Sequence, residues 1–293
     1  MGGILSPRLP TALPPAEGLD LREFQYRQED FECVRRLLYQ RAGISLSASK
    51  EQMVYSRLAR RLRSLGLGSF AAYFEYLQQY EGEWQQFINA LTTNLTAFFR
   101  EGHHFEMLAA HARQQAHERR PLRIWCCASS TGEEPYSLAM TLIEALGSFS
   151  PAVQIIASDI DTGVLGTARQ GIYPEQRIEQ LELTRKKHFF LRGVGAQQGR
   201  VRVRPELQAL IDFRQINLLD ADWGIPPGLD AIFCRNVMIY FDKPTQNRLL
   251  ERMIRLLRPD GLFFAGHSES FVQATHLVKL VERTVYRPAQ ERP

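Results

Sequence analysis

Apolar residues recur at helical spacing through the first part of the chain. The clearest stretch covers residues 50–65, where four apolar side chains return every three or four positions and therefore share one helix face. These residues are Val54, Leu58, Leu62 and Leu65. The same spacing predicts further helices over 24–41, 70–80 and 84–91, so we expect a helical N-terminal domain over residues 21–91.

The pattern changes after Pro121, where short continuous apolar runs, typical of buried strands, begin to alternate with helical stretches. Strands are predicted over 122–128, 153–158, 211–216, 230–234 and 262–266, with one or two more over 277–286. Helices are predicted over 133–146, 162–169 and 244–257. This alternation is typical of a mostly parallel sheet with helices on both faces, so residues 92–293 are predicted to form an α/β domain with a doubly wound sheet.

A segment at about 184–205 interrupts this alternation. Two strand-like runs, 188–192 and 200–204, flank a stretch that contains Gly193, Gly195 and Gly199. Glycine is common where a hairpin turns, because it adopts backbone conformations that other residues avoid. We therefore expect a small antiparallel β insertion that packs on the sheet as a flap.

Composition is that of an ordinary globular protein, with 44% hydrophobic and 23% charged residues, and a net charge of +4 does not indicate a nucleic-acid partner. No signal peptide or membrane-spanning helix is predicted, so we expect a cytoplasmic protein without direct membrane insertion. The four cysteines include no C-x-x-C pair and are expected to be reduced. Residues 1–20, which include four prolines, are expected to form a flexible tail.

Ligands of doubly wound sheets bind beyond the carboxyl ends of the strands, so the residues that follow each strand form the candidate site. The first predicted strand leads into a turn of small residues and then into Glu133 and Glu134 at the start of a helix. The second strand is followed by Asp159, which can accept hydrogen bonds from both hydroxyls of a ribose. Later strands are followed by Asn217 and Asn236, whose amides suit adenine or the amino-acid end of a cofactor.

These groups favour S-adenosyl-L-methionine (SAM) over NAD as the cofactor. The turn after the first strand contains only Gly132, whereas a pyrophosphate requires G-x-G-x-x-G, and two glutamates at the helix start would repel phosphate. SAM has no phosphate and carries a positive sulfonium, so nearby carboxylates favour its binding. From spacing alone, NAD remains the alternative.

Five motifs resemble, in order, the signatures of the chemotaxis receptor glutamate methyltransferases, the CheR family. The first is LTTNLTAFFRE at 91–101, and the second is STGEEPYS at 130–137. The others are ASDID at 157–161, FCRNVMIYF at 233–241 and FAGHSE at 264–269. The resemblance extends from about residue 24 to residue 286. Cys126 and Cys127 depart from it, because small residues such as serine or alanine are expected there, but cysteine is also small and SAM binding is expected to survive.

The resemblance implies a protein-glutamate O-methyltransferase that acts on methyl-accepting chemotaxis receptors in sensory adaptation, at receptor arrays of the inner membrane. It implies SAM as the cofactor, S-adenosyl-L-homocysteine (SAH) as the product, and no metal. By motif position, Arg100 and Tyr240 would line the transfer site. The cofactor contacts would be Asn94, Thr96, Arg100, Glu134, Asp159, Asn217, Leu218, Asn236 and Val237.

Receptor docking is the second expectation. Arg57, Arg60 and Arg61 lie in a basic stretch that complements acidic methylation helices, although a solvated helix face is the alternative. The resemblance implies that the helical domain recognises receptors. It also implies that, in some members, a loop with the spacing of Gly193, Gly195 and Gly199 binds a C-terminal receptor tail by strand addition. An ordinary solvent-exposed hairpin is the alternative.

Two other functions compete with this interpretation. A nucleic-acid methyltransferase often carries a D/N-P-P-Y/F motif after the fourth strand, and residues 235–240 lack those prolines. A non-catalytic docking module would not need both Arg100 and Tyr240. The histidines lack the arrangement of a metal site, and His267, Ser268 and Glu269, which are adjacent in sequence, are expected to shape a strand end instead of forming a hydrolase triad.

Overall fold

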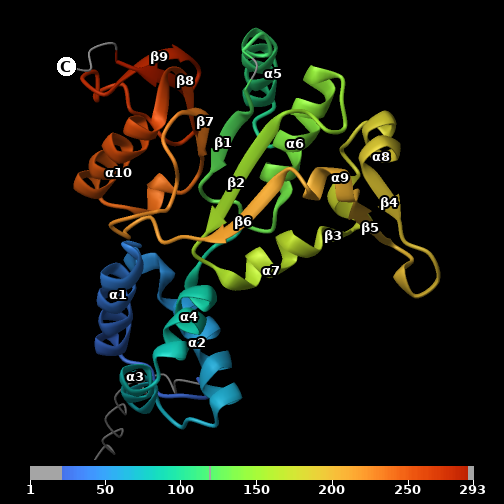
Figure 1. The fold of residues 1–293 in the computed structure, drawn as a ribbon. Coiled ribbons are helices and arrows are strands. Elements are labelled where there is room, and N and C mark those ends of the chain that lie inside the picture. The colour runs from blue at the N-terminus through green and yellow to red at the C-terminus, as the bar shows by residue number, and fades with distance from the viewer. Residues whose placement is uncertain (1–21, 119, 290–293) are drawn as a thin grey trace, which may run out of the picture.

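The N-terminal part of the chain folds into four α-helices, as its periodicity predicts (Figure 1). The structure, a computed structural model, describes residues 22–118 and 120–289; the predicted tail lies outside them. Gly43 and Gly66 end the first two helices in the left-handed conformation, with φ of 70° and 68°. The elements are α1 (Gln28–Ala42), η1 (Ala48–Lys50), α2 (Glu51–Leu65), α3 (Phe70–Gln79) and α4 (Glu81–Leu91).

The first helix begins later than predicted. Phe24 and Tyr26 are buried in the helical core but precede α1. Arg27 is extended, with φ of −105° and ψ of 162°, and its amide donates to the Asp30 carboxylate at 2.8 Å. The apolar side chains at 24 and 26 therefore lie in an irregular segment before the helix, which the sequence pattern does not separate from a helical turn.

A seven-stranded sheet forms the centre of the α/β part, in the order β6-β2-β1-β7-β8-β10-β9. The five strands from β6 to β8 are parallel to their neighbours, and β10 pairs antiparallel with both β8 and β9. The predicted doubly wound, mostly parallel sheet is thus confirmed. The strands are β1 (Leu122–Cys126), β2 (Val153–Asp159), β6 (Ile211–Gln215), β7 (Leu229–Cys234), β8 (Leu257–Ala265), β9 (Val278–Glu282) and β10 (Val285–Pro288).

Helices cover both faces of this sheet, because successive side chains of a strand point to opposite sides. Cys126 belongs to the apolar layer under α5 (His103–Gln115) and α6 (Glu133–Leu146), and Cys127 belongs to the layer under α10 (Lys243–Leu256). A further helix, α7 (Thr162–Gln170), contacts β2 and β6. The sequence pattern does not predict α5, because two histidines and several polar residues obscure its buried face.

The insertion differs from its prediction in extent and position. It is a three-stranded antiparallel sheet, in the order β3-β5-β4, because a strand at Ile172–Pro174 joins the two predicted ones. In Figure 1 this sheet lies to the side of the main sheet instead of covering it. Residues 172–203 are called the β insertion below. Its region comprises β3 (Ile172–Pro174), η2 (Glu175–Ile178), α8 (Leu183–Phe189), β4 (Phe190–Arg192), η3 (Gly195–Gln197) and β5 (Arg200–Val203), followed by α9 (Pro205–Gln208).

Candidate active site

A cavity of about 380 Å³ lies where the loops after β1, β2, β6 and β7 meet the helical domain. Ile44, Leu46 and Met53 line it from the helical domain. All nine predicted cofactor contacts line this cavity, and so does Tyr240. The fold therefore brings together residues from four of the five sequence motifs.

The turn after β1 brings the backbone close to the cavity. Ser130 and Gly132 are left-handed, with φ of 47° and 100°. A Cβ on Gly132 would lie 2.8 Å from the hydroxyl of Tyr173 and 3.1 Å from the Cα of Ala168, so this position requires glycine. The Ser130 amide points at the Asp159 carboxylate and donates to it at 2.8 Å.

Asp159 is a buried carboxyl group held by the backbone. It accepts hydrogen bonds from the amides of Ser130 and Asp161, at 2.8 Å and 3.0 Å. Only 9% of the residue is exposed, and this burial raises the pKa of Asp159 to about 6. A carboxylate fixed in this way at the end of β2 suits the two hydroxyl donors of a ribose.

Asn94 is positioned by Asp161, a residue to which sequence reasoning assigned no separate role. The Asn94 side-chain amide donates to Oδ2 of Asp161 at 2.8 Å, and the Thr92 hydroxyl donates to the same oxygen at 2.7 Å. The other oxygen, Oδ1, accepts from the Gly163 amide at 2.8 Å and caps α7. Asp161 thus ties the segment before Arg100 to the loop after β2.

Arg100 lies on a strained turn. Phe99 and Glu101, its neighbours, both have left-handed backbones, with φ of 53° and 59°. The Phe99 amide donates to Oγ of Ser137 in α6 at 2.9 Å, and Nη1 of Arg100 donates to the Leu95 carbonyl at 3.0 Å. The Arg100 side chain remains 36% exposed and lines the cavity.

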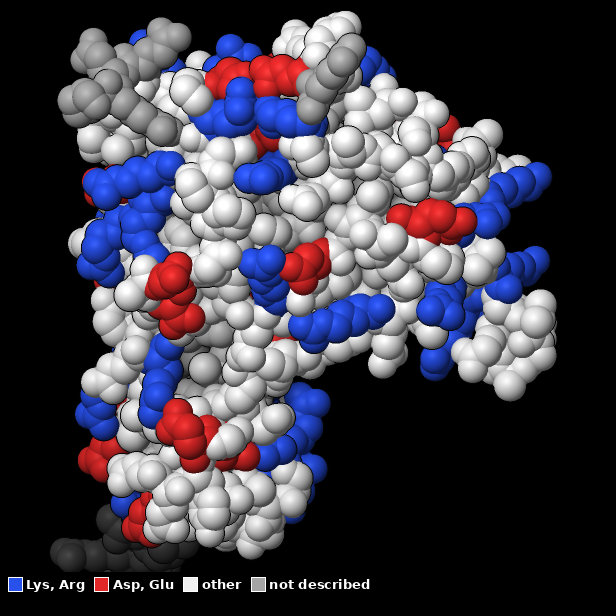
Figure 2. All heavy atoms as spheres, viewed as in Figure 1, with Lys and Arg blue, Asp and Glu red and all other residues white. Residues whose placement is uncertain are grey.

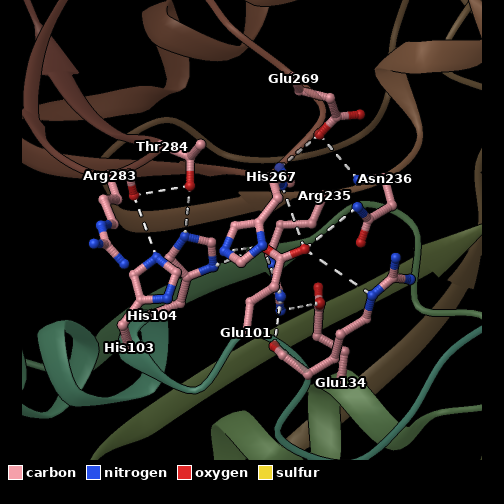
Figure 3. A network of polar contacts seen from close by, with 12 residues as sticks. Glu101, His103, His104, Glu134, Arg235, Asn236, His267, Glu269, Arg283 and Thr284 are labelled. Atoms are coloured by element: carbon pink, nitrogen blue, oxygen red, sulfur yellow. Dashed lines mark hydrogen bonds and ion pairs between the residues drawn. The ribbon is translucent and has the colours of Figure 1, made fainter.

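A buried guanidinium beneath this turn was missed by sequence reasoning (Figure 3). The Arg235 side chain is 1% exposed, its Nη1 donates to Oε2 of Glu134 at 2.6 Å, and its Nη2 donates to the Arg100 carbonyl. Nη2 also lies 3.2 Å from Oε2 of Glu101. Burial lowers the pKa of the adjacent His104 to about 3, so this histidine is neutral near pH 7. Arg235 therefore links Glu134, a predicted cofactor contact, to the turn that carries Arg100. Its position directly before Asn236 in the fourth motif was the sequence signal by which it could have been found.

A second buried carboxyl group organises the loop after β7. Oε1 of Glu269 accepts from the amides of Met238 and Ile239 at 2.7 and 3.3 Å. Oε2 accepts from the amides of Gly266 and Asn236 at 2.6 and 2.9 Å. Burial raises the pKa of Glu269. The expectation that this residue shapes a strand end, instead of serving a hydrolase triad, agrees with these four contacts.

The helical domain is hydrogen-bonded to the rim of the cavity. The Asn217 side-chain amide donates to the Arg41 carbonyl at 2.8 Å, and its Oδ1 accepts from the Leu219 amide at 3.0 Å. The Ser45 amide donates to the Tyr240 carbonyl at 2.8 Å. Leu218, next to Asn217, is buried. The shape of the cavity therefore depends on the contact between the two parts of the chain.

The three arginines predicted to dock receptors have different surroundings. Arg57 donates to the Ala90 and Thr92 carbonyls at 3.2 and 2.5 Å, which fixes the end of α4. Arg61 makes two hydrogen bonds, at 3.0 and 2.6 Å, to the buried Glu83 carboxylate. Arg60 is exposed, and its contact is with a carbonyl of its own helix. Of the three, Arg60 presents its charge most directly to solvent.

The glycines in the loop of the β insertion occupy positions where a side chain would clash or strain the backbone. A Cβ on Gly193 would lie 2.0 Å from the Gln197 carbonyl oxygen, and Gly195 and Gly199 are left-handed, with φ of 57° and 79°. The insertion also exposes Arg192, Arg200 and Arg202, and Figure 2 shows basic side chains gathered at this end of the molecule. The loop is thus a defined turn beside a basic surface.

Within residues 22–118 and 120–289, no group of three or more His, Cys, Asp or Glu side chains converges as a metal site would require. No described helix combines the length and apolar content that a bilayer crossing requires.

Comparison with known proteins identifies the family. The model of the CheR methyltransferase SAM binding domain matches residues 94–287, and the model of the CheR methyltransferase all-alpha domain matches residues 29–92. The chain belongs to the CheR methyltransferase family. This membership decides the choice of cofactor in favour of SAM over NAD, because the matched domain is a SAM binding domain.

Relatives of this CheR-family chain are chemotaxis methyltransferases. Chemotaxis protein methyltransferase 2 of Pseudomonas aeruginosa is 65% identical over 282 residues, which cover 96% of this chain and 100% of that protein. The chemotaxis protein methyltransferase of Escherichia coli is 53% identical over 258 residues, which cover 87% and 89% of the two chains. A solved structure of PKMT2 from Rickettsia typhi with AdoHcy is 14% identical, with a TM-score of 0.32 over 54% of this chain and 24% of that one. The chain is therefore a chemotaxis protein methyltransferase with a SAM-binding domain.

Proposed function

We propose that this CheR-family protein methylates glutamate side chains of methyl-accepting chemotaxis receptors and releases glutamate methyl ester and SAH. The observation that carries the proposal is that Glu134, Asp159, Arg100 and Tyr240 line one and the same cavity. Two carboxyl groups suit a cationic nucleoside, and a guanidinium with a phenol suits a carboxylate acceptor.

The cavity fits SAM by its carboxylate acceptors. Asp159 offers a buried carboxylate at the place where a ribose binds in such sheets, and Glu134, held by Arg235, offers acceptor oxygens to a cationic group. When bound, SAM supplies an electrophilic methyl group on a positively charged sulfur. The strained turn at Phe99 and Glu101 positions Arg100 next to this cofactor space.

The chemistry needs no general base. A glutamate carboxylate has an ordinary pKa of about 4.3, so it is already ionised at neutral pH. Arg100 would orient this carboxylate through charge, and the Tyr240 hydroxyl would donate a hydrogen bond. Alignment of the two reacting groups, together with removal of water from the cavity, would supply most of the acceleration.

The proposal is tested with methyl-labelled SAM and receptor-containing membranes. Wild-type protein should transfer label that is released as methanol in base, as a carboxyl ester requires. Arg100→Ala should reduce turnover while it stays folded, and receptors whose methylation-site glutamates are replaced by alanine should take up no label. Label that resists base, or transfer that persists in those receptors, would refute glutamate esterification.

Receptor docking belongs to the same proposal. We propose that the helical domain, residues 21–91, contacts acidic methylation helices through its basic surface, with Arg60 as the exposed member of the predicted set. The α/β domain, residues 92–293, would carry catalysis. The β insertion would add a receptor tail as a strand next to its glycine loop, and such tethering would hold the protein at receptor arrays. Calorimetry with a receptor tail peptide tests this step, and no heat of binding would remove it.

A further inference from the structure

The β insertion contacts the segment that carries the predicted cofactor residues. Nη2 of Arg177, in η2, donates to the Thr96 carbonyl at 3.1 Å. The same guanidinium donates from Nε to Oε1 of Glu133 at 3.1 Å and forms a second, shorter contact through Nη2. Arg177 therefore connects a cofactor-side backbone atom to the first turn of α6.

The partner carboxylate of Arg177 is buried. The Glu133 side chain is 1% exposed, against 39% for Arg177, so its charge depends on contacts within the protein. Its second oxygen accepts from the Thr131 hydroxyl at 2.6 Å. Arg177 thus neutralises an anion located directly beside the turn after β1.

Aromatic packing reinforces this contact. Phe98, two residues before Arg100, lies edge-on to Tyr173 of β3 and to Phe190 of β4, with ring centroids 5.2 and 5.5 Å apart. The Tyr173 hydroxyl donates to the Thr131 carbonyl at 2.7 Å. Two strands of the insertion therefore pack against the segment between Asn94 and Arg100. One of them, β3, also contacts the turn after β1 through the Tyr173 hydroxyl.

We propose that Arg177 is a positioning residue for cofactor binding. Its guanidinium holds the Thr96 carbonyl, and with it the segment from Asn94 to Arg100, against the cavity. The β insertion then supports a segment that lines the cofactor cavity, in addition to any role in receptor tethering. This inference rests on SAM binding in the cavity and not on the identity of the methyl acceptor.

The test measures SAH binding and thermal unfolding of the full chain. Arg177→Met keeps the length of the side chain but removes its donors, and its dissociation constant for SAH should rise about 10-fold, the size expected for a lost charge-assisted contact. Arg177→Lys can still neutralise Glu133 and should show a smaller rise. Arg192→Met is the matched control, because Arg192 lies in the same insertion but is 76% exposed, and it should bind like the wild type.

A double variant separates positioning from stability. Arg177→Met combined with Glu133→Gln removes the buried charge together with its partner, so its unfolding temperature should recover toward the wild type. Its SAH affinity should stay weak, because the Thr96 carbonyl still lacks its donor. Wild-type affinity in a folded Arg177→Met protein, or recovery of affinity in the double variant, would overturn the inference. Either result would leave glutamate methylation untouched, because the experiment contains no receptor.

Discussion

Asp159 should make the affinity for SAH depend on pH. Burial raises its pKa to about 6, and only the ionised carboxyl group can accept hydrogen bonds from ribose hydroxyls with both oxygens. With that pKa, the ionised fraction falls from about 0.9 at pH 7 to about 0.1 at pH 5. The apparent dissociation constant should therefore rise about 10-fold over this range, equivalent to about 1.4 kcal/mol.

Isothermal titration calorimetry with SAH at several pH values between 5 and 8 measures this dependence. The control is Asp159→Asn, which keeps the shape of the side chain and cannot ionise. It should bind SAH weakly at every pH, without a step near pH 6. An affinity of the wild type that stays constant from pH 5 to pH 8, or an equal step in Asp159→Asn, would refute the reasoning.

The same shift gives a stability effect of defined sign. The pKa of Asp159 is higher in the folded protein, about 6, than the ordinary value of 3.8, so the folded state binds the proton more tightly. This contribution to stability is complete below pH 3.8 and is lost as the pH rises through about 6, at most about 3 kcal/mol. Without SAH, the unfolding free energy should therefore fall between pH 4 and pH 7 by more in the wild type than in Asp159→Asn.

Three further predictions concern four substitutions. Gly132→Ala should weaken SAH binding and lower the unfolding free energy by about 1–3 kcal/mol, measured by calorimetry and denaturant unfolding, because its Cβ would meet the Tyr173 hydroxyl at a left-handed backbone. Arg60→Glu should raise the KM for the receptor and the salt dependence of that KM, without loss of stability. Arg57→Glu should instead lower the melting temperature, because Arg57 donates to two backbone carbonyls. Equal effects of the two variants would contradict the assignment of Arg60 to docking and of Arg57 to a structural role. Glu269→Gln should lower the unfolding free energy by about 2–4 kcal/mol, because its new amide group would face two backbone donors. An unchanged denaturation midpoint would contradict this role of the carboxylate.

Several features of the fold were predictable because they depend on local patterns. The apolar stripe of α2 lies on its buried face at Val54, Leu58 and Leu62, as its spacing requires. The strand and helix alternation after Pro121 identified the sheet, since a parallel strand pair needs a crossover helix. The additional strand β3 was not predictable, because three residues carry too little periodicity to be recognised.

For the candidate site, the sequence by itself determined which side chains follow each strand. Because parallel strands end on the same side of a sheet, it also determined that Asp159 and Asn236 lie at the same edge. Only the tertiary structure decided how these side chains are held. Arg235, Glu269 and Arg177 act across long sequence separations, and a hydrogen bond between distant residues leaves no periodic signal in the chain. Their roles depend on the burial of the side chain itself or, for Arg177, of its partner Glu133, because a buried charge is costly when unpaired and rigidly held when its hydrogen bonds are satisfied.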